Sequence, residues 1–311
     1  MSIRTAVIGV GSLGRHHARI LGERHDSKLE FVVDADAERA EKIAKANKTN
    51  YLTDFNELVG DVDAAVISVP TPYHYQVAKP LLQSGVHCLV EKPFTLNVAE
   101  AEELIEIAKS RNLVLQVGHV ERFNPAIIAA VPFISSPKFI EVNRLGPYDP
   151  RTNHIGVVLD LMIHDLDILF YLVKDKVVSL EAHGAKILSD TEDIAKVRLR
   201  YAGGCVADVS ASRVSMEKYR KIRIFQPDSY VSIDYAGKNL KVYVKKEGRE
   251  KIASLFDIDV KKPKLPPNEP LFYELDNFIS SVIEGKKPAV SGEQGRDSVE
   301  LALNILKNMR F

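Results

Sequence analysis

The sequence of 311 residues predicts an α/β protein with two domains. A β-branched run near the start leads into three closely spaced glycines and a helix-compatible segment, and apolar strands then alternate with helices to about residue 118. This alternation is typical of a parallel sheet covered by helices on both faces. From about residue 138 strands dominate. We therefore expect an N-terminal nucleotide-binding domain over residues 1–120 and a C-terminal α/β (α+β) domain with a large, mostly antiparallel open sheet over residues 121–311.

The glycines form the motif Gly9-x-Gly11-x-x-Gly14 directly after the first strand. Gly9 permits a tight strand-to-helix turn, Gly11 lets the backbone approach a pyrophosphate, and Gly14 lets the helix pack close to the strand. The N–H groups at the start of the next helix favour negative charge there, so Ser12 and Leu13 belong to the predicted cofactor site.

The second strand, residues 28–34, ends in Asp34, twenty positions after Gly14. An acid at this place accepts hydrogen bonds from ribose hydroxyls, and together with the glycines it predicts a Rossmann domain. Asp36 is close and no arginine directly follows Asp34, so a 2′-phosphate would be repelled. The sequence therefore favours NAD over NADP as the cofactor.

Two later loops of the first domain also carry candidate residues. The buried strand at 62–69 ends in a rigid loop at the carboxyl edge of the sheet, where α/β proteins bind ligands, and this loop contributes Pro70, Thr71 and His74 to the predicted cofactor site. The strand at 86–90 runs into Glu91 and Lys92, followed by a proline that restricts Lys92 to extended geometry. Lys92 is expected at the mouth of the crevice; the alternative is an exposed, solubilising lysine.

The remaining elements of the first domain follow from local signals. We expect helices at residues 35–44, 75–84 and 98–110, the last with Asn97 as N-cap, and a closing strand at 113–117.

The second domain is predicted to be an antiparallel meander within one mixed sheet that has one open face. The row of basic residues on the strand at 195–201 is interpreted as a solvated sheet face rather than a nucleic-acid stripe, because no aromatic residues interleave with it. A proline-rich connector at 261–270 precedes helices at 271–284 and 293–309, where Ser291 and Gln294 form a candidate capping box. The other strands are expected at 138–144, 177–187, 205–209, 220–225, 230–234 and 240–244.

A helix at 157–172 precedes most of these strands and carries Asp160, His164 and Asp167 at positions i, i+4 and i+7. These residues are expected to share one face of an otherwise apolar helix, where burying them costs free energy unless they are paired or functional. A metal site and a structural core histidine are two alternatives. We favour a catalytic His164 oriented by Asp160, without a metal, because no third ligand stands at a recognisable spacing.

Composition narrows the function further. The 42 basic and 42 acidic residues cancel, so no global field draws the protein to nucleic acid or an anionic membrane. No apolar run is long enough to span a bilayer, and the N-terminus does not resemble a signal peptide. Cys88 and Cys205 fall in apolar strand-like runs and are expected to be reduced core residues, which indicates a cytoplasmic protein.

The glycine motif, Glu91-Lys92-Pro93 and Asp160-x-x-x-His164, in this order, resemble the glucose–fructose oxidoreductase/inositol dehydrogenase/rhizopine catabolism (Gfo/Idh/MocA) family over essentially the whole chain. The resemblance implies that Lys92 bridges nicotinamide and substrate hydroxyl, often before a cis proline. It also implies Asp160 and His164 as the acid and the general acid/base, and a homodimer or homotetramer formed through the open sheet face.

Within the family, residues 118–125 resemble a segment of nucleotide-sugar oxidoreductases, in particular those that oxidise carbon 3 of UDP-N-acetylglucosamine to a 3-keto sugar. The expected substrate is therefore a sugar or nucleotide sugar. Asn124 and Pro125 also suit a helix start. Other sugars or polyols, such as inositol or glucose, and a non-catalytic NAD-sensing regulator remain alternatives. The candidate substrate residues are His119, Glu121, Arg122, Asn124, Tyr148 and Arg213, with Arg220 as a further candidate for a diphosphate.

Overall fold

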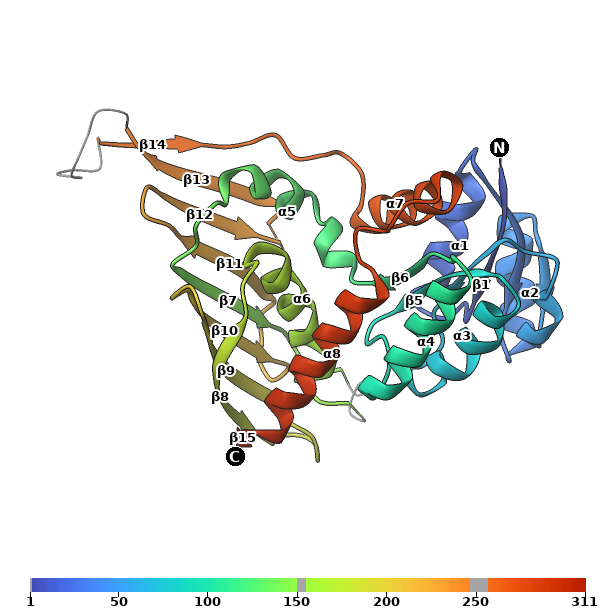
Figure 1. Cartoon of the computed structure of the whole chain (residues 1–311), viewed down its shortest axis with the longest axis horizontal. Coiled ribbons are helices and arrows are strands. Elements are labelled where there is room, and N and C mark those ends of the chain that lie inside the picture. Colours follow the sequence, from blue (N-terminus) through green and yellow to red (C-terminus); the bar gives the residue numbers. More distant parts are fainter. Residues whose placement is uncertain (1, 150–154, 236, 247–256) are drawn as a thin grey trace. The chain divides into compact units, whose positions relative to one another are not determined.

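The structure is a computed structural model, and it describes residues 2–149, 155–235, 237–246 and 257–311 (Figure 1). The chain forms two compact units. The first comprises Met1–Val120 and Leu271–Glu300, and the second comprises Glu121–Pro270 and Leu301–Phe311.

The first unit contains a six-stranded parallel sheet in the order β3-β2-β1-β4-β5-β6. The strand order runs outward in both directions from β1 and β4, so right-handed crossovers place the connecting helices on opposite faces. The strands are β1 (Ile3–Ile8), β2 (Ser27–Val33), β3 (Asn50–Leu52), β4 (Ala64–Ile67), β5 (His87–Glu91) and β6 (Leu115–Gly118), and the helices between them are α1 (Gly14–Glu23), α2 (Ala37–Asn47), α3 (His74–Gln83) and α4 (Val98–Ser110).

The predicted Rossmann architecture is confirmed. The helix predicted at 98–110 has the predicted limits, and Asn97 caps it by accepting a hydrogen bond from the Glu100 amide at 2.9 Å. The short edge strand β3 was not predicted, because only three residues pair there.

The first unit also includes α7 (Pro270–Glu284) and the start of α8 (Gly292–Lys307), which the sequence assigned to the second domain. The reason is the apolar face of α7, where Leu275, Phe278 and Ile279 join the core formed by β1, β2 and α1. One of the two hydrogen bonds of the predicted capping box is present: the Ser291 amide donates to the side-chain oxygen of Gln294 at 3.0 Å.

The second unit contains a nine-stranded mixed sheet in the order β14-β13-β12-β11-β7-β10-β9-β8-β15. Most neighbours are antiparallel, as predicted, but β7 and β10 pair in parallel at the centre of the sheet, which a pure meander would not give. The strands are β7 (Phe139–Leu145), β8 (Val177–Ala185), β9 (Ile194–Tyr201), β10 (Val206–Ser212), β11 (Tyr219–Phe225), β12 (Ser229–Asp234), β13 (Asn239–Lys245), β14 (Ile258–Lys261) and β15 (Met309–Arg310).

One face of this sheet packs against helices. In Figure 1, α5 (Pro125–Ala130) and α6 (Ile163–Leu172) lie on the same face. Strand residues alternate strictly: Ile140, Val197 and Val231 are fully buried in the core on that side, whereas their neighbours on the other face are partly or fully exposed. In the described parts of the chain, no helix combines the length and apolar character needed to cross a membrane.

Candidate active site

The glycine turn between β1 and α1 has the geometry that a bound dinucleotide phosphate requires. Gly9 has φ +83°, and a Cβ there would lie 2.6 Å from the carbonyl oxygen of Ser68, so only glycine fits. A Cβ at Gly14 would lie 1.8 Å from the Gly9 carbonyl oxygen, whereas one at Gly11 would meet no atom within 4 Å. The backbone is therefore tight where it turns and open where a ligand approaches, with Ser12 and Leu13 exposed beside it.

Asp34 lies directly after β2 and is 9% exposed. Its carboxylate oxygens accept hydrogen bonds from the amides of Val10 and Asp36, each at 3.0 Å, which fixes the acid beside the glycine turn. The guanidinium of the half-exposed Arg39 lies 3.0 Å from the Asp34 carboxylate and also 3.0 Å from the Asp36 carboxylate. The residues directly after Asp34 gave no sign of Arg39, which the first turn of α2 brings next to the Asp34 carboxylate.

The loop after β4 holds the predicted cofactor residues Pro70, Thr71 and His74. Pro70 is exposed and Thr71 is partly exposed, whereas His74 is buried with its two ring nitrogens 2.9 Å from the backbone carbonyls of Val69 and Pro93. Burial lowers the pKa of His74, and these carbonyls only partly offset that effect. His74 therefore ties the loop after β4 to the loop after β5, a structural task that the prediction of a cofactor ligand did not include.

Lys92 follows β5 and is partly buried, and its peptide bond to Pro93 is cis. The preceding Glu91 is 5% exposed and its side chain is paired with His17 at 2.7 Å. Glu91 was predicted as a cofactor residue, but its carboxylate is already engaged with protein groups.

The segment after β6 contains four predicted substrate residues with different environments. His119 is fully buried. Arg122 is also buried and donates two hydrogen bonds to the carboxylate of Asp167 in α6, while its guanidinium lies over the ring of Tyr171. Asn124 caps α5 by accepting from the Ala126 amide at 3.0 Å, so the helix-start interpretation of this residue is confirmed.

Glu121 belongs to a buried charge network in the second unit. Arg144 on β7 lies 2.8 Å from Glu121 and forms a two-pronged pair with Asp165 in α6, at 2.7 and 2.8 Å. Burial opposes ionisation of Glu121, but the nearby guanidinium outweighs it and holds the pKa of Glu121 below its usual value. Neither Arg144 nor Asp165 was singled out from the sequence, since nothing local links positions 21 residues apart.

The helix with Asp160 and His164 begins as a π-helical turn, η6 (Val158–Met162), and continues as α6. Asp160 and His164 are partly buried, on either side of this junction. Asp167, three positions after His164 in α6, is 0% exposed and paired with Arg122, so the free-energy cost of burying it is offset by a structural ion pair. No cluster of metal-ligating side chains was found at Asp160 and His164 among the described residues; the group that was found is His17, Glu91 and Glu274 in the first unit.

A cavity of about 370 Å³ lies in the second unit beside Asp160. Arg213 is 3% exposed and bound to Asp193 at 2.7 Å, and it lies under the ring of Tyr148, so it supports the wall of the cavity. Lys218 is exposed and the side chain of Arg220 is 39% exposed, so these two cations are accessible. Lys218 was missed from the sequence. The lining residues are Arg144, Leu145, Gly146, Pro147, Tyr148, Asp149, Asp160, Leu161, Arg213, Lys218 and Arg220.

The fold and the glycine turn define a dinucleotide-binding protein with a second α/β unit that carries a polar cavity lined by arginine, lysine and aspartate side chains. Family comparisons agree with this description. Residues 3–119 match the model described as an oxidoreductase family with an NAD-binding Rossmann fold, and residues 140–230 match the GFO/IDH/MocA C-terminal domain. The chain belongs to the Gfo/Idh/MocA family of oxidoreductases, and its first unit is an NAD-binding Rossmann domain.

Individual relatives align over nearly the full length. The chain is 36% identical over 305 residues to UDP-N-acetylglucosamine 3-dehydrogenase of Acidithiobacillus ferrooxidans, covering 97% of this chain and 96% of the relative. It is 27% identical to myo-inositol 2-dehydrogenase of Thermotoga maritima over 99% of this chain and 96% of that enzyme. A solved structure of the Acidithiobacillus enzyme superposes with a TM-score of 0.92 at 35% identity, covering 99% and 98% of the two chains. Levoglucosan dehydrogenase in complex with NADH shares the fold, with a TM-score of 0.89 at 18% identity over 99% and 97%.

Proposed function

We propose that the protein oxidises carbon 3 of UDP-N-acetylglucosamine to the 3-keto sugar, with NAD as the hydride acceptor. The observation that carries this proposal is the cavity beside Asp160. Lys218 and Arg220 present accessible positive charge there, and the buried Arg144 and Arg213 also line the cavity. A nucleotide diphosphate carries negative charge that such a site attracts, whereas inositol or glucose carries none. The similarity to the Acidithiobacillus enzyme supports the same substrate.

The cofactor fits the residues of the first unit. The open position at Gly11 and the N-terminus of α1, whose first turn has no acidic residue, suit the pyrophosphate. Asp34 suits the adenosine ribose, and Pro70, Thr71 and Lys92 line the strand ends toward which the cofactor extends. When bound, NAD supplies the acceptor for the hydride that leaves the sugar carbon.

His164 and Lys92 are proposed to act on the substrate hydroxyl, and Asp160 is proposed to act through His164. His164 removes the hydroxyl proton, which lets the oxygen form a double bond to carbon as hydrogen leaves that carbon with both bonding electrons as a hydride. Lys92 donates a hydrogen bond to the oxygen and stabilises its developing negative charge. Asp160 orients the imidazole of His164. Among the predicted substrate residues, Tyr148 is proposed to contact the nucleotide, whereas Arg122, Asn124 and Arg213 shape the site through the contacts described above.

The test is turnover with NAD on a matched panel of substrates: UDP-N-acetylglucosamine, UDP-glucose, free N-acetylglucosamine and myo-inositol. We expect NADH absorbance and a product lighter by two hydrogens with UDP-N-acetylglucosamine. Reaction with inositol but not with the nucleotide sugar would refute the substrate assignment and leave the oxidoreductase assignment intact. Binding of NAD without redox change on any sugar would indicate a regulator.

Catalytic roles are tested by Lys92→Ala and His164→Ala. Loss of a positioned base typically costs about 10² to 10⁴-fold in rate, and loss of an electrostatic donor about 10² to 10³-fold. Both variants should therefore nearly abolish turnover while the dissociation constant for NAD stays close to that of the wild type. Near-normal turnover in either variant would refute the role of that residue.

We further propose that the protein is a homodimer or homotetramer that associates through the open face of the nine-stranded sheet. That face carries a row of aromatic rings with centroid separations of 6.1, 4.8 and 5.2 Å along Phe139, Phe225, Tyr230 and Tyr243. An aromatic row of this kind suits a self-complementary interface. Phe225→Glu should convert the assembly to monomers in sedimentation velocity, and an unchanged sedimentation coefficient would refute the proposed interface.

A cytoplasmic location is proposed from the cysteines. Cys88 and Cys205 are both buried as free thiols, and burial raises the pKa of each, so neither is poised for oxidation. Free thiols of this kind suit a reducing compartment. Fractionation of cells that express the protein at native level tests the location.

A further inference from the structure

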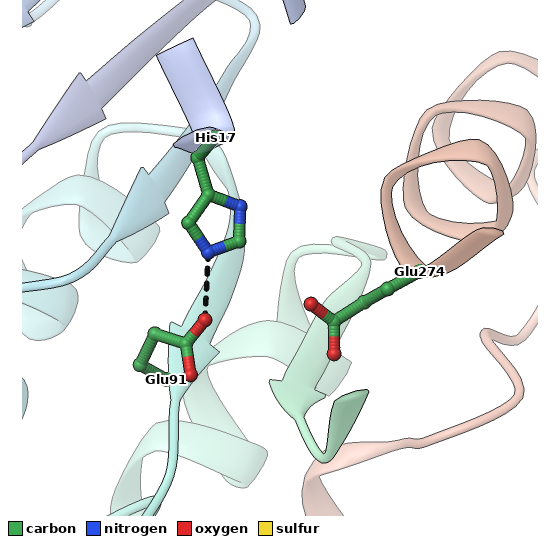
Figure 2. A group of neighbouring side chains, drawn as sticks. All are labelled: His17, Glu91 and Glu274. Atoms are coloured by element: carbon green, nitrogen blue, oxygen red, sulfur yellow. Dashed lines mark hydrogen bonds and ion pairs between the residues drawn. The ribbon is translucent and has the colours of Figure 1, made fainter. Parts of the chain in front are cut away.

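Lys92 is joined through its backbone to a buried cluster of three titratable side chains, His17, Glu91 and Glu274 (Figure 2). His17 lies in the first turn of α1, Glu91 ends β5 and Glu274 lies in α7, so the cluster lies entirely within the first unit. Their exposures are 0%, 5% and 0%, and one nitrogen or oxygen atom from each lies within 4.8 Å of the others. Figure 2 shows the carboxylate of Glu274 directed toward the His17–Glu91 pair.

The carboxylate of Glu91 is held at both of its oxygens. Oε1 lies 2.7 Å from Nε2 of His17, and Oε2 accepts a hydrogen bond from the backbone amide of Lys92 at 3.3 Å. This one carboxylate therefore joins the helix that follows the glycine turn to the backbone from which the Lys92 side chain extends.

The neighbouring strand leaves space for this arrangement. Gly118 pairs with Glu91 across β5 and β6, and a Cβ at Gly118 would lie 2.7 Å from Oε2 of Glu91 and 3.0 Å from its Cα. Any other residue at position 118 would push the carboxylate away from the Lys92 amide. Position 118 therefore has to be glycine so that the Glu91 side chain on the neighbouring strand β5 can keep its place.

The geometry favours a hydrogen-bonded network over a metal centre. Zinc binds histidine nitrogen and carboxylate oxygen at about 2.0–2.2 Å, which separates two tetrahedral ligands by about 3.3 Å. The 2.7 Å between Nε2 of His17 and Oε1 of Glu91 is shorter than this and is the length of a charge-assisted hydrogen bond.

We propose that His17 is a positioning residue for hydride transfer, acting on Lys92 through Glu91; this inference rests on the proposed function. The helix that receives the cofactor phosphates also fixes the backbone of the lysine that contacts the reacting oxygen. Glu274 brings a second carboxylate to the buried imidazole. A displacement of about 1 Å at a reacting group can cost about 10²-fold in rate, so a link of this kind has a measurable effect on kcat.

The first test compares His17→Gln with His17→Leu. Gln retains an N–H donor that reaches Glu91, whereas Leu does not. We expect kcat within about threefold of the wild type for His17→Gln and about 10- to 100-fold lower for His17→Leu, with the KM for the sugar and the dissociation constant for NAD unchanged. Equal kcat losses for the two variants would overturn the proposal.

His17→Leu leaves a buried carboxylate without its partner and could fail to fold, so the decisive variant is the double substitution His17→Leu with Glu91→Met. Replacing both members of a buried pair by apolar groups of similar size commonly restores stability. We expect the thermal unfolding temperature to recover while kcat stays low, because Glu91→Met removes the acceptor of the Lys92 amide. Recovery of both stability and kcat would show that the cluster serves folding alone.

A second readout does not depend on the substrate. Amide hydrogen exchange at Lys92, followed by NMR, should accelerate in the double variant, whereas Glu106→Gln, an exposed glutamate on α4, should match the wild type. Unchanged exchange at Lys92 would overturn the proposal even if the substrate assignment holds. If the wild type turned over no sugar, the proposed function would fail and the exchange measurement would still decide the link. A divalent metal bound stoichiometrically to the purified protein would overturn the hydrogen-bonded interpretation.

Discussion

Replacing Asp34 by serine should change which dinucleotide the first unit prefers. The Asp34 carboxylate lies at the end of β2, where it accepts two backbone hydrogen bonds and pairs with Arg39 at 3.0 Å. A hydrogen bond to a charged group contributes about 1.5–3 kcal/mol, which corresponds to a factor of about 10 to 150 in the dissociation constant. Asp34→Ser should therefore weaken NADH binding by about that factor.

The same substitution should strengthen NADPH binding. It removes a negative charge that repels a 2′-phosphate and releases the Arg39 guanidinium, whose side chain is 47% exposed, from one of its two carboxylate partners, while the pair with Asp36 remains. An ion pair at such an exposed site contributes about 1 kcal/mol at most, so the gain is about fivefold. Together the two effects shift the NADH-to-NADPH preference by about 50- to 750-fold.

The assay is fluorescence titration of NADH and NADPH at fixed ionic strength, which needs no sugar. The double variant Asp34→Ser with Arg39→Gln should lose the NADPH gain. Asp36→Ser is the matched control, because it removes another carboxylate from the same guanidinium and keeps a capping oxygen for α2. NADH binding by Asp34→Ser equal to that of the wild type, or an NADPH gain that persists without Arg39, would refute the reasoning.

Three further predictions concern the second unit. Arg220→Gln should raise the KM for UDP-N-acetylglucosamine by about fivefold with little change in kcat, because its partly exposed side chain lines the cavity; an unchanged KM would remove Arg220 from the diphosphate site. Asp167→Asn should destabilise the protein by about 3–5 kcal/mol, measured by calorimetry, because it leaves the buried Arg122 without its counter-charge. The lowered pKa of Glu121 in the folded state means that its contribution to stability is present above the unfolded-state value of about 4.3 and is lost as the pH falls through the folded-state value. The thermal unfolding temperature should fall between pH 7 and 3 as this contribution is lost, and this pH dependence should be weaker in Glu121→Gln.

The sequence predicted those features that depend on local signals. Gly9 and Gly14 stand in a turn that only glycine tolerates, and the helix at 98–110 carries its own cap at Asn97, so both were recognisable without the fold. The position of α7 was not, because an apolar helix face shows that the helix is buried but not which sheet buries it.

Charge pairs between distant positions were also missed. The sequence pattern places Arg39 on the exposed face of a helix. Only the turn between β2 and α2 brings its guanidinium next to the Asp34 carboxylate. Arg122 and Asp167 are 45 positions apart, so the pattern suggested a substrate contact for the one and a shared helix face for the other. Long-range pairing leaves no periodic signal, and burial then turns candidate ligands into structural residues.

The helix that carries His164 shows how such pairs bear on the site. A continuous α-helix would place Asp160, His164 and Asp167 on one face, but η6 is π-helical and so changes the rotation of Asp160 relative to His164 and Asp167, which both lie in α6. In the observed rotation Asp165 and Asp167 are both buried, clamped by Arg144 from β7 and by Arg122 from the segment after β6. Asp165 and Asp167 stand two positions apart in α6, about 200° around the helix axis, so two buried ion pairs hold the helix from nearly opposite sides and His164 stays partly accessible between them. Arg122, a predicted substrate residue, and Arg144, which the sequence did not single out, both hold the helix of the proposed base. Weakening either pair should therefore disturb catalysis through the orientation of His164 rather than through substrate affinity.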